Sequence, residues 1–425
     1  MKKTIFIILG LLLLSACTSN QEKIIHLENE TNTSSEINNK STDPEINTEV
    51  QELPICPTST ATNCRIIQGT TQEEGHGSCT GTGTRELKRA PMNPEDIAMI
   101  IPMGAMVGSH VTPIDHMYFQ PTNFSSEPDT YNVYADAEGI ITSIQREEHF
   151  PENKHEKYRL IIMHSCDFYS IYNLLTSLSP EIEEKIGTIE PGESSGVTIP
   201  VKEGDILGKI GGQTLDLSLN YDAITLEGFI VPEHYLGESW KIHTVDPFDY
   251  FREPIKTELL AKDIRTAEPR GGKIDYDIDG KLVGNWFVEG SGGFPKEYIT
   301  DSWKNHLSFV YDPIDPSHLI ISIGNFSGEP TQSGIKGNSP DPQNVNIDSG
   351  IIKYELVNSE YILANTGESW SRIIYANNIQ AISGESQKGV ILVQMLSQRK
   401  IKVESFPNKT ASEVSNFINP IIYER

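Results

Sequence analysis

The sequence has few basic residues, few cysteines and no apolar run long enough to cross a bilayer. Its 34 Lys and Arg residues are outnumbered by 59 Asp and Glu residues, which gives a formal net charge of −25. Nucleic acids and anionic lipid surfaces bind proteins through clustered basic side chains, so this charge balance argues against both partners. A membrane-spanning helix needs about 20 apolar residues, and the apolar run at residues 5–14 falls short of that length.

The first residues instead fit an export signal. Lys2 and Lys3 precede the apolar run, and a positive start before a short apolar stretch is typical of a secretory signal peptide. The run ends in Leu14-Ser15-Ala16-Cys17, which fits a bacterial lipobox at every position. We therefore expect residues 1–16 to be a lipoprotein signal peptide. Cys17 would then carry a lipid that tethers the chain to the outer face of a membrane, in the cell envelope and outside the cytoplasm. The alternative is an ordinary signal peptide with an incidental cysteine.

Four cysteines follow Cys17, and an even number in an exported chain permits two disulfides. Cys56 and Cys64 flank a short polar stretch, so we expect them to pair with each other. Cys79 would then pair with Cys166 and tie the start of the folded region to a strand within it. A zinc site is the alternative, but no C-x-x-C spacing supports one.

The composition changes near residue 56. Residues 17–55 contain no aromatic residue and are rich in Asn, Ser, Thr and Glu, so we expect a disordered stalk. The remaining length suggests two domains. We place the first at residues 56–255, with a cysteine-containing extension at its start, a polar connector at 256–271, and a second domain at 272–425.

Short β-type runs separated by Gly, Pro and Asp turns dominate both domains, which predicts a mainly β protein built of sandwiches or barrels. We expect short helices only at 93–99 and 179–185. The Gly284-Asn285-Trp286 segment is similar to the start of a lipocalin-type barrel. We predict no ligand from this similarity. The expected strands are 131–135, 139–144, 158–164, 168–174, 206–210 and 215–219 in the first domain, and 280–290, 307–311, 319–323, 351–356, 371–375, 389–396 and 400–404 in the second.

Two histidines and an aspartate lie close together at His110, Asp115 and His116. Imidazole nitrogens and carboxylate oxygens are good zinc ligands, and two ligands from one tight segment need only one or two more. Pro113 excludes a regular helix, so these side chains would come from a bent loop that enters a strand. The alternative is that they only cap a turn.

The order of motifs around this segment resembles the lysostaphin/LytM-type zinc metallopeptidases, which cut peptidoglycan cross-bridges. The resemblance covers about residues 100–251, and each motif is short while the ordered series is more specific. In chain order the segments are His110 with Asp115, Val133-Tyr134-Ala135 through Ile141, Tyr172-Asn173-Leu174-Leu175, Val201 through Gly208, Thr214-Leu215-Asp216-Leu217 and Asp246-Pro247-Phe248-Asp249-Tyr250.

The resemblance implies a sandwich or barrel of the duplicated hybrid motif type, and a zinc site formed by His110, Asp115 and Asp216, with His116 as a spare ligand. It also shows departures. Leu174 and Thr214 stand where the family has the two histidines that assist catalysis, and leucine cannot move a proton. The first motif is one residue longer than in the family.

Three functions follow from this pattern. The chain would be a catalytically impaired, peptidase-like module that binds a cell-wall glycan, a peptide or a metal. Alternatively, it would be an active zinc-dependent envelope hydrolase with altered ligands. In the third, the second domain is the functional part and the first is its scaffold.

Overall fold

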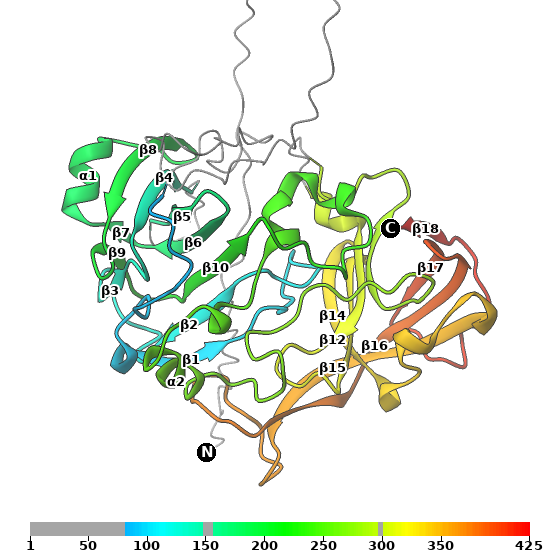
Figure 1. Ribbon diagram of the computed structural model, residues 1–425. Helices are drawn as coiled ribbons and strands as arrows, with labels where there is room; N and C mark the ends of the chain where they lie inside the picture. Colours follow the sequence, from blue (N-terminus) through cyan, green and yellow to red (C-terminus); the bar gives the residue numbers. More distant parts are fainter. Residues whose placement is uncertain (1–80, 148–155, 296–300) are drawn as a thin grey trace, which may run out of the picture.

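The computed structural model describes residues 81–147, 156–295 and 301–425, which form two β-rich units (Figure 1). The predicted signal peptide, Cys17, the stalk, Cys56, Cys64 and Cys79 lie outside these residues. Within them, no helix is both long and apolar enough to span a membrane. The mainly β fold class is confirmed.

The first unit contains a seven-stranded antiparallel sheet and a three-stranded one that share a single apolar core. The large sheet has the order β1 (Ile97–Ile101), β2 (Met117–Pro121), β10 (Leu215–Tyr221), β6 (Phe168–Leu175), β5 (Tyr158–Ser165), β4 (Gly139–Arg146) and β8 (Ser194–Val201). The small sheet has the order β3 (Tyr131–Tyr134), β9 (Ile206–Ile210) and β7 (Ser177–Leu178).

Strand β10 decides which polar side chains reach the candidate site. Leu215, Leu217 and Leu219 point into the shared core. Because successive residues of a strand face opposite sides of a sheet, Asp216 projects from the other face. That face is also covered, since Asp216 is only 1% exposed. The covering segment is η3 (Pro232–His243), a 3₁₀ region whose Trp240 packs on residues of β5 and β6.

The second unit is a closed eight-stranded barrel in which the strands pair in chain order. An up-and-down barrel leaves no unpaired sheet edge. Trp286 is completely buried, its indole N–H donates to the Leu282 carbonyl at 2.8 Å, and the guanidinium of Arg425 lies 4.1 Å from its ring centre. The strands are β11 (Gly284–Val288), β12 (His306–Tyr311), β13 (Leu319–Phe326), β14 (Glu329–Ile335), β15 (Ile351–Leu363), β16 (Ile379–Ser397), β17 (Lys400–Pro407) and β18 (Ile421–Glu424).

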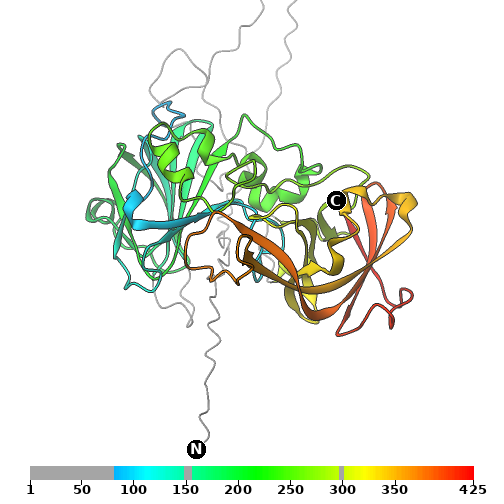
Figure 2. The ribbon, with the colours of Figure 1, turned by 90° about the horizontal axis from the view of Figure 1, so that it is seen from below.

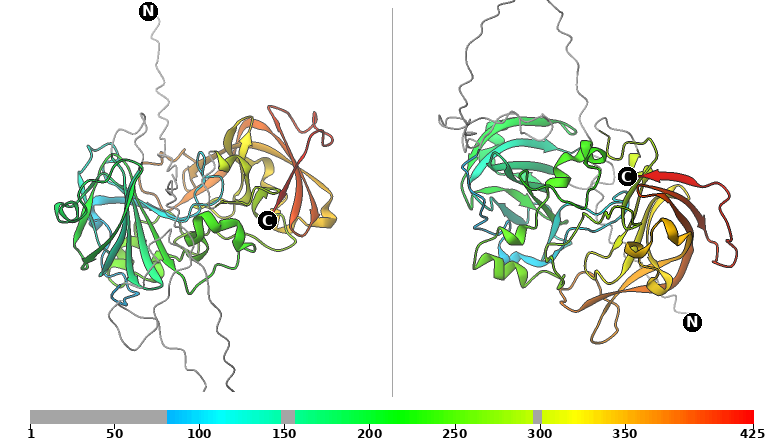
Figure 3. Two further views of the ribbon diagram at one scale, coloured as in Figure 1. Left: turned by 90° about the horizontal axis from the view of Figure 1, so that it is seen from above. Right: turned by 45° about the vertical axis from the view of Figure 1, so that its right-hand side comes forward.

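Strands β15 and β16 are much longer than the barrel needs, and their far ends form an arm that reaches the first unit (Figure 2). Trp370, in the connection between the two strands, shares a small buried cluster with Met99 of β1 and Ile264. The arm therefore joins the barrel to the edge of the large sheet. Figure 3 shows the two units from further directions.

Residues 256–271, which we expected to be a polar connector, pack closely against both units. The segment begins with α2 (Ile255–Leu260), and the Lys262 carbonyl then accepts a hydrogen bond from Ile100 of β1 at 2.8 Å. Arg265 is 2% exposed and donates to the Pro313 carbonyl at 2.5 Å.

Two local predictions are wrong, whereas the helix expected at 179–185 is present as α1 (Pro180–Ile186). Residues 93–99 hold only η2 (Pro94–Asp96), because the chain then pairs with β2 as strand β1. Residues 371–375 form bends rather than a strand. Their apolar side chains gain no burial there, as Ile374 is 67% exposed.

Candidate functional site

The predicted site residues Asp115, His116 and Asp216 meet beside the start of β2. Strand β10 pairs with β2 so that Asp216 lies opposite Tyr118, two residues beyond His116. The His116 Nδ1 atom is 3.4 Å from Asp115 Oδ1, and its Nε2 atom is 3.3 Å from Asp216 Oδ2. One imidazole ring thus bridges two carboxylates, one from the loop before β2 and one from β10.

The remaining carboxylate oxygens also have partners. Trp240 Nε1 donates to Asp115 Oδ2 at 2.6 Å, and Thr214 Oγ1 donates to Asp216 Oδ1 at 2.8 Å. Buried polar groups carry a free-energy penalty when they lack a partner, so these bonds stabilise the cluster as a unit. All four oxygens of the two carboxylates are therefore occupied by contacts within the chain.

Burial and charge act in opposite directions on this cluster. Asp115 is 7% exposed and His116 8%. Burial would lower the pKa of His116, but its bonds to Asp115 and Asp216 outweigh this and raise the pKa to about 9. Burial likewise opposes ionisation of Asp115, yet His116 and the nearby Lys241 hold the Asp115 pKa well below its usual range. The ring is therefore a cation at neutral pH.

The structure does not bring His110 into a metal-holding group with Asp115, His116 and Asp216. The Gly104 and Ile114 backbones pair at the base of a closed loop, where Gly104 N donates to the Ile114 carbonyl at 2.8 Å. His110 lies in the turn at the other end, where its N–H donates to the Val107 carbonyl at 3.0 Å. Asp115 and His116 follow the base of this loop along the chain.

The predicted zinc set is not assembled in the part of the chain that the structure describes. No group of three or more His, Cys, Asp or Glu side chains within that part is arranged to hold a metal ion. The physical reason lies in His116, which we had taken as a spare ligand. Its two nitrogens face opposite ways, so the carboxylates of Asp115 and Asp216 are held on opposite sides of the ring rather than around a common point.

Leu174 and Thr214 occupy the two positions where the resemblance predicts catalytic histidines. Leu174 is 2% exposed with a left-handed backbone (φ 71°), and its carbonyl accepts a bond from Gln213 Nε2 at 2.5 Å. Thr214 is 4% exposed and bonded to Asp216. Neither side chain can act as a general base at neutral pH.

Sequence reasoning missed Trp240 and Lys241. Trp240 is 125 positions from Asp115 along the chain, and no local pattern connects the two. Lys241 pairs with Glu238 at 3.2 Å and is 5% exposed. Only the covering of the second face of the sheet by η3 brings these side chains to the cluster.

A second polar cluster, Asp136, His164 and Ser170, has the residue types of a serine hydrolase. Ser170 Oγ donates to Asp136 Oδ2 at 2.9 Å and lies 2.9 Å from His164 Nε2. All three residues are completely buried, and His164 Nδ1 also lies 2.8 Å from the Glu138 carbonyl. Because no substrate reaches them, these groups form a structural network.

Cys166 lies in the turn between β5 and β6. Gly83 N donates to the His164 carbonyl at 2.6 Å, so the chain just after position 79 runs beside the strand that leads to Cys166. The pairing of Cys79 with Cys166 stays a prediction.

Comparison with known proteins adds one distant likeness. No protein-family model matches the chain, and no curated protein matches it significantly. Among solved structures, the antimicrobial peptidase lysostaphin from Staphylococcus simulans is similar at 11% sequence identity, over 80% of this chain and 92% of that chain, with a TM-score of 0.20. A likeness this distant carries no argument about fold or activity. The mainly β architecture therefore rests on the observed sheets, and the resemblance to the peptidase family rests on the order of the motifs.

Proposed function

We propose that this chain is a lipid-anchored protein of the cell envelope whose peptidase-like unit is catalytically impaired and binds an envelope glycan or peptide. The observation that carries the proposal is the closed pairing of Asp115, His116 and Asp216. Both ring nitrogens and all four carboxylate oxygens contact other side chains of the protein.

Hydrolysis of a peptide by a metal enzyme needs an open coordination position and a group that takes the proton from the attacking water. The cluster offers neither, because its polar atoms are paired and Asp216 is 1% exposed. With Leu174 and Thr214 at the positions of the assisting histidines, general acid–base help of typically 10²–10⁴-fold per group is lost.

The anchor and the stalk supply the location in this proposal. A lipid on Cys17 and a polar stretch of nearly forty residues would hold the folded units away from the membrane surface. Folded units held there would be within reach of the polymers of the cell envelope.

The test uses the chain beginning at residue 18, purified without chelators. We expect less than 0.1 equivalent of bound zinc by elemental analysis and no release of fragments from purified peptidoglycan, together with sedimentation of the protein with that polymer. Stoichiometric zinc that is lost in Asp216→Ala, together with peptidoglycan cleavage, would establish the active hydrolase instead. Glu203→Ala, which changes an exposed carboxylate, serves as the control.

Absence of sedimentation with peptidoglycan would contradict the binding part of the proposal even if zinc and cleavage are also absent. Trypsin resistance of each variant, compared with the parent chain, separates loss of binding from loss of folding.

A further inference from the structure

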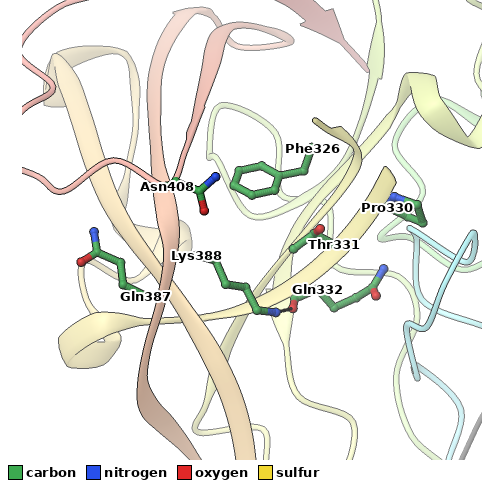
Figure 4. Close-up of a pocket in the computed structure, with 7 residues that line it drawn as sticks. All are labelled: Phe326, Pro330, Thr331, Gln332, Gln387, Lys388 and Asn408. Carbon is green, nitrogen blue, oxygen red and sulfur yellow. Dashed lines mark hydrogen bonds between the residues drawn. The ribbon is translucent and has the colours of Figure 1, made fainter. Parts of the chain in front are cut away.

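A cavity of about 430 Å³ opens at one end of the barrel (Figure 4). Strand β13 ends there, β14 begins, and β17 has just ended. The cavity is shallow and largely open to solvent, so a ligand there would stay partly exposed. The lining residues are Phe326, Pro330, Thr331, Gln332, Gln387, Lys388 and Asn408.

Lys388 is the only charged side chain of this lining. Its ammonium donates to the Gln332 carbonyl at 2.6 Å, and burial lowers its pKa with no charged group contributing to the shift. An ammonium has three protons to donate, and the carbonyl uses one of them. In a chain of net charge −25, this lysine therefore lacks an acidic partner among the described residues.

The rest of the lining supplies an apolar wall and neutral polar groups. Phe326 belongs to the barrel core and is 8% exposed, while Thr331 and Asn408 add a hydroxyl and an amide. Gln332 is held in place, since its Nε2 lies 3.2 Å from both the Ser322 hydroxyl and the Gly108 carbonyl. Figure 4 shows the Phe326 ring, the Asn408 amide and the Lys388 chain around the same space.

We propose that this cavity binds a small organic monocarboxylate, with the Lys388 ammonium pairing with the carboxylate and the Phe326 ring packing on the apolar part of the ligand. A single lysine balances a single negative charge. A phosphate group is the poorer fit, because a phosphate monoester carries about −1.5 to −2 charges at neutral pH and one lysine balances only one of them. The site lies in the barrel and does not depend on the function proposed for the first unit.

The test is isothermal titration of the chain beginning at residue 18 with two acids, N-acetylmuramic acid and N-acetylphenylalanine, each compared with its own primary amide. We expect at least one acid to bind 10-fold or more tightly than its amide. The sugar acid and the amino acid distinguish a glycan carboxylate from a peptide carboxyl terminus as the source of the same chemistry. If neither acid binds more tightly than its amide, the proposal is overturned.

Variants locate the binding. Lys388→Gln is expected to weaken the preferred acid at least 10-fold and to abolish its advantage over the amide. Lys353→Gln is the matched control, because that lysine of the same barrel donates to the Ala411 and Val414 carbonyls outside the cavity. Unchanged binding in Lys388→Gln would contradict the assignment.

Asn408→Gly provides a second variant should Lys388→Gln not fold, since a glycine adopts the backbone of Asn408 (φ 59°) without strain. It is expected to weaken the acid several-fold, and unchanged affinity in that case would also overturn the proposal. Asp216→Ala should leave binding of the acid unaltered, because Asp216 lies in the first unit. Failure of the titration with the acids would therefore not bear on the peptidoglycan test, and the reverse also holds.

Discussion

His116 holds two buried carboxylates apart and neutralises part of their charge at the same time. Its ring is 3.4 Å from Asp115 and 3.3 Å from Asp216, and its pKa is raised to about 9. The sequence suggested a metal-binding group here because histidine and aspartate are also the usual ligands of zinc. Whether these residues bind a metal or pair with one another depends on the positions of their atoms, and those positions are set only in the folded chain.

Replacing His116 with alanine should leave two carboxylates buried without their shared partner. Removal of one member of a buried ion pair typically costs about 3–5 kcal/mol. We expect the free energy of unfolding of the chain to fall by about this amount, measured by urea denaturation at pH 7. Trp240→Phe, which removes the bond to Asp115 and alters the contact of Arg159 with the indole ring, should cost about 1–3 kcal/mol. A loss in His116→Ala no larger than that in Trp240→Phe would contradict the role given to the ring.

The stability of the barrel depends on Arg425, the residue that follows its last strand, β18. Arg425 is 4% exposed, stacks on Trp286, and donates to the Val283 carbonyl at 2.5 Å and the Ile278 carbonyl at 2.7 Å. It also lies 3.4 Å from Asp277, whose pKa burial raises to about 6 despite this cation. Arg425 thus fixes the segment before β11 to the end of β18.

Arg425→Ala should leave the buried Asp277 carboxylate without its cation, although Asn285 N still donates to it, and should leave two buried carbonyls without this donor. We expect the free energy of unfolding of the chain to fall by about 3–5 kcal/mol. The matched control is Arg399→Ala, which breaks the exposed pair with Asp279 and should cost about 0–1 kcal/mol. Equal effects of the two substitutions in guanidinium denaturation would show that the buried arginine does not close the barrel.

The strands of the large sheet illustrate which elements the sequence could predict. Residues 158–164 and 215–219 alternate or concentrate apolar side chains and lie between turn residues, and both are strands in the structure. Strand β1 was missed because residues 93–99 contain a local helix signal, whereas its strand state depends on pairing with β2. The cluster at His116 was only partly predicted, since Trp240 reaches it through contacts distant in sequence.

Several contacts join the two units, and two of them are the packed segment 256–271 and the β15–β16 arm. A further contact packs Phe287 of β11 against Tyr235 of η3. The arm contributes Trp370 and Tyr361, whose rings meet edge-on at 5.9 Å between centres, to a cluster with residues of the first unit. Tyr361 also donates to Asp312 at 2.6 Å, which ties the arm back to the barrel. Local sequence patterns predict neither the segment nor the arm, because the conformation of each depends on its contacts with residues that are distant in sequence.

Trp370→Ala should weaken the junction between the units more than it weakens either unit. Truncating a buried tryptophan costs about 3–5 kcal/mol. In differential scanning calorimetry we expect one cooperative transition in the parent chain and two separated transitions in the variant. Ile374→Ala, at an exposed position of the same connection, should leave the single transition intact. A single transition in Trp370→Ala, shifted by less than 1 °C, would argue against the arm as the junction.

The β15–β16 arm also has a consequence for how the protein moves. Two units joined by a loose linker would rotate independently, and each would sample its own orientations. Here the arm crosses from the barrel to β1 while residues 256–271 occupy a second line of contact. The pair should therefore tumble as a single particle, so that the two units keep a fixed orientation toward each other whenever either of them meets a ligand.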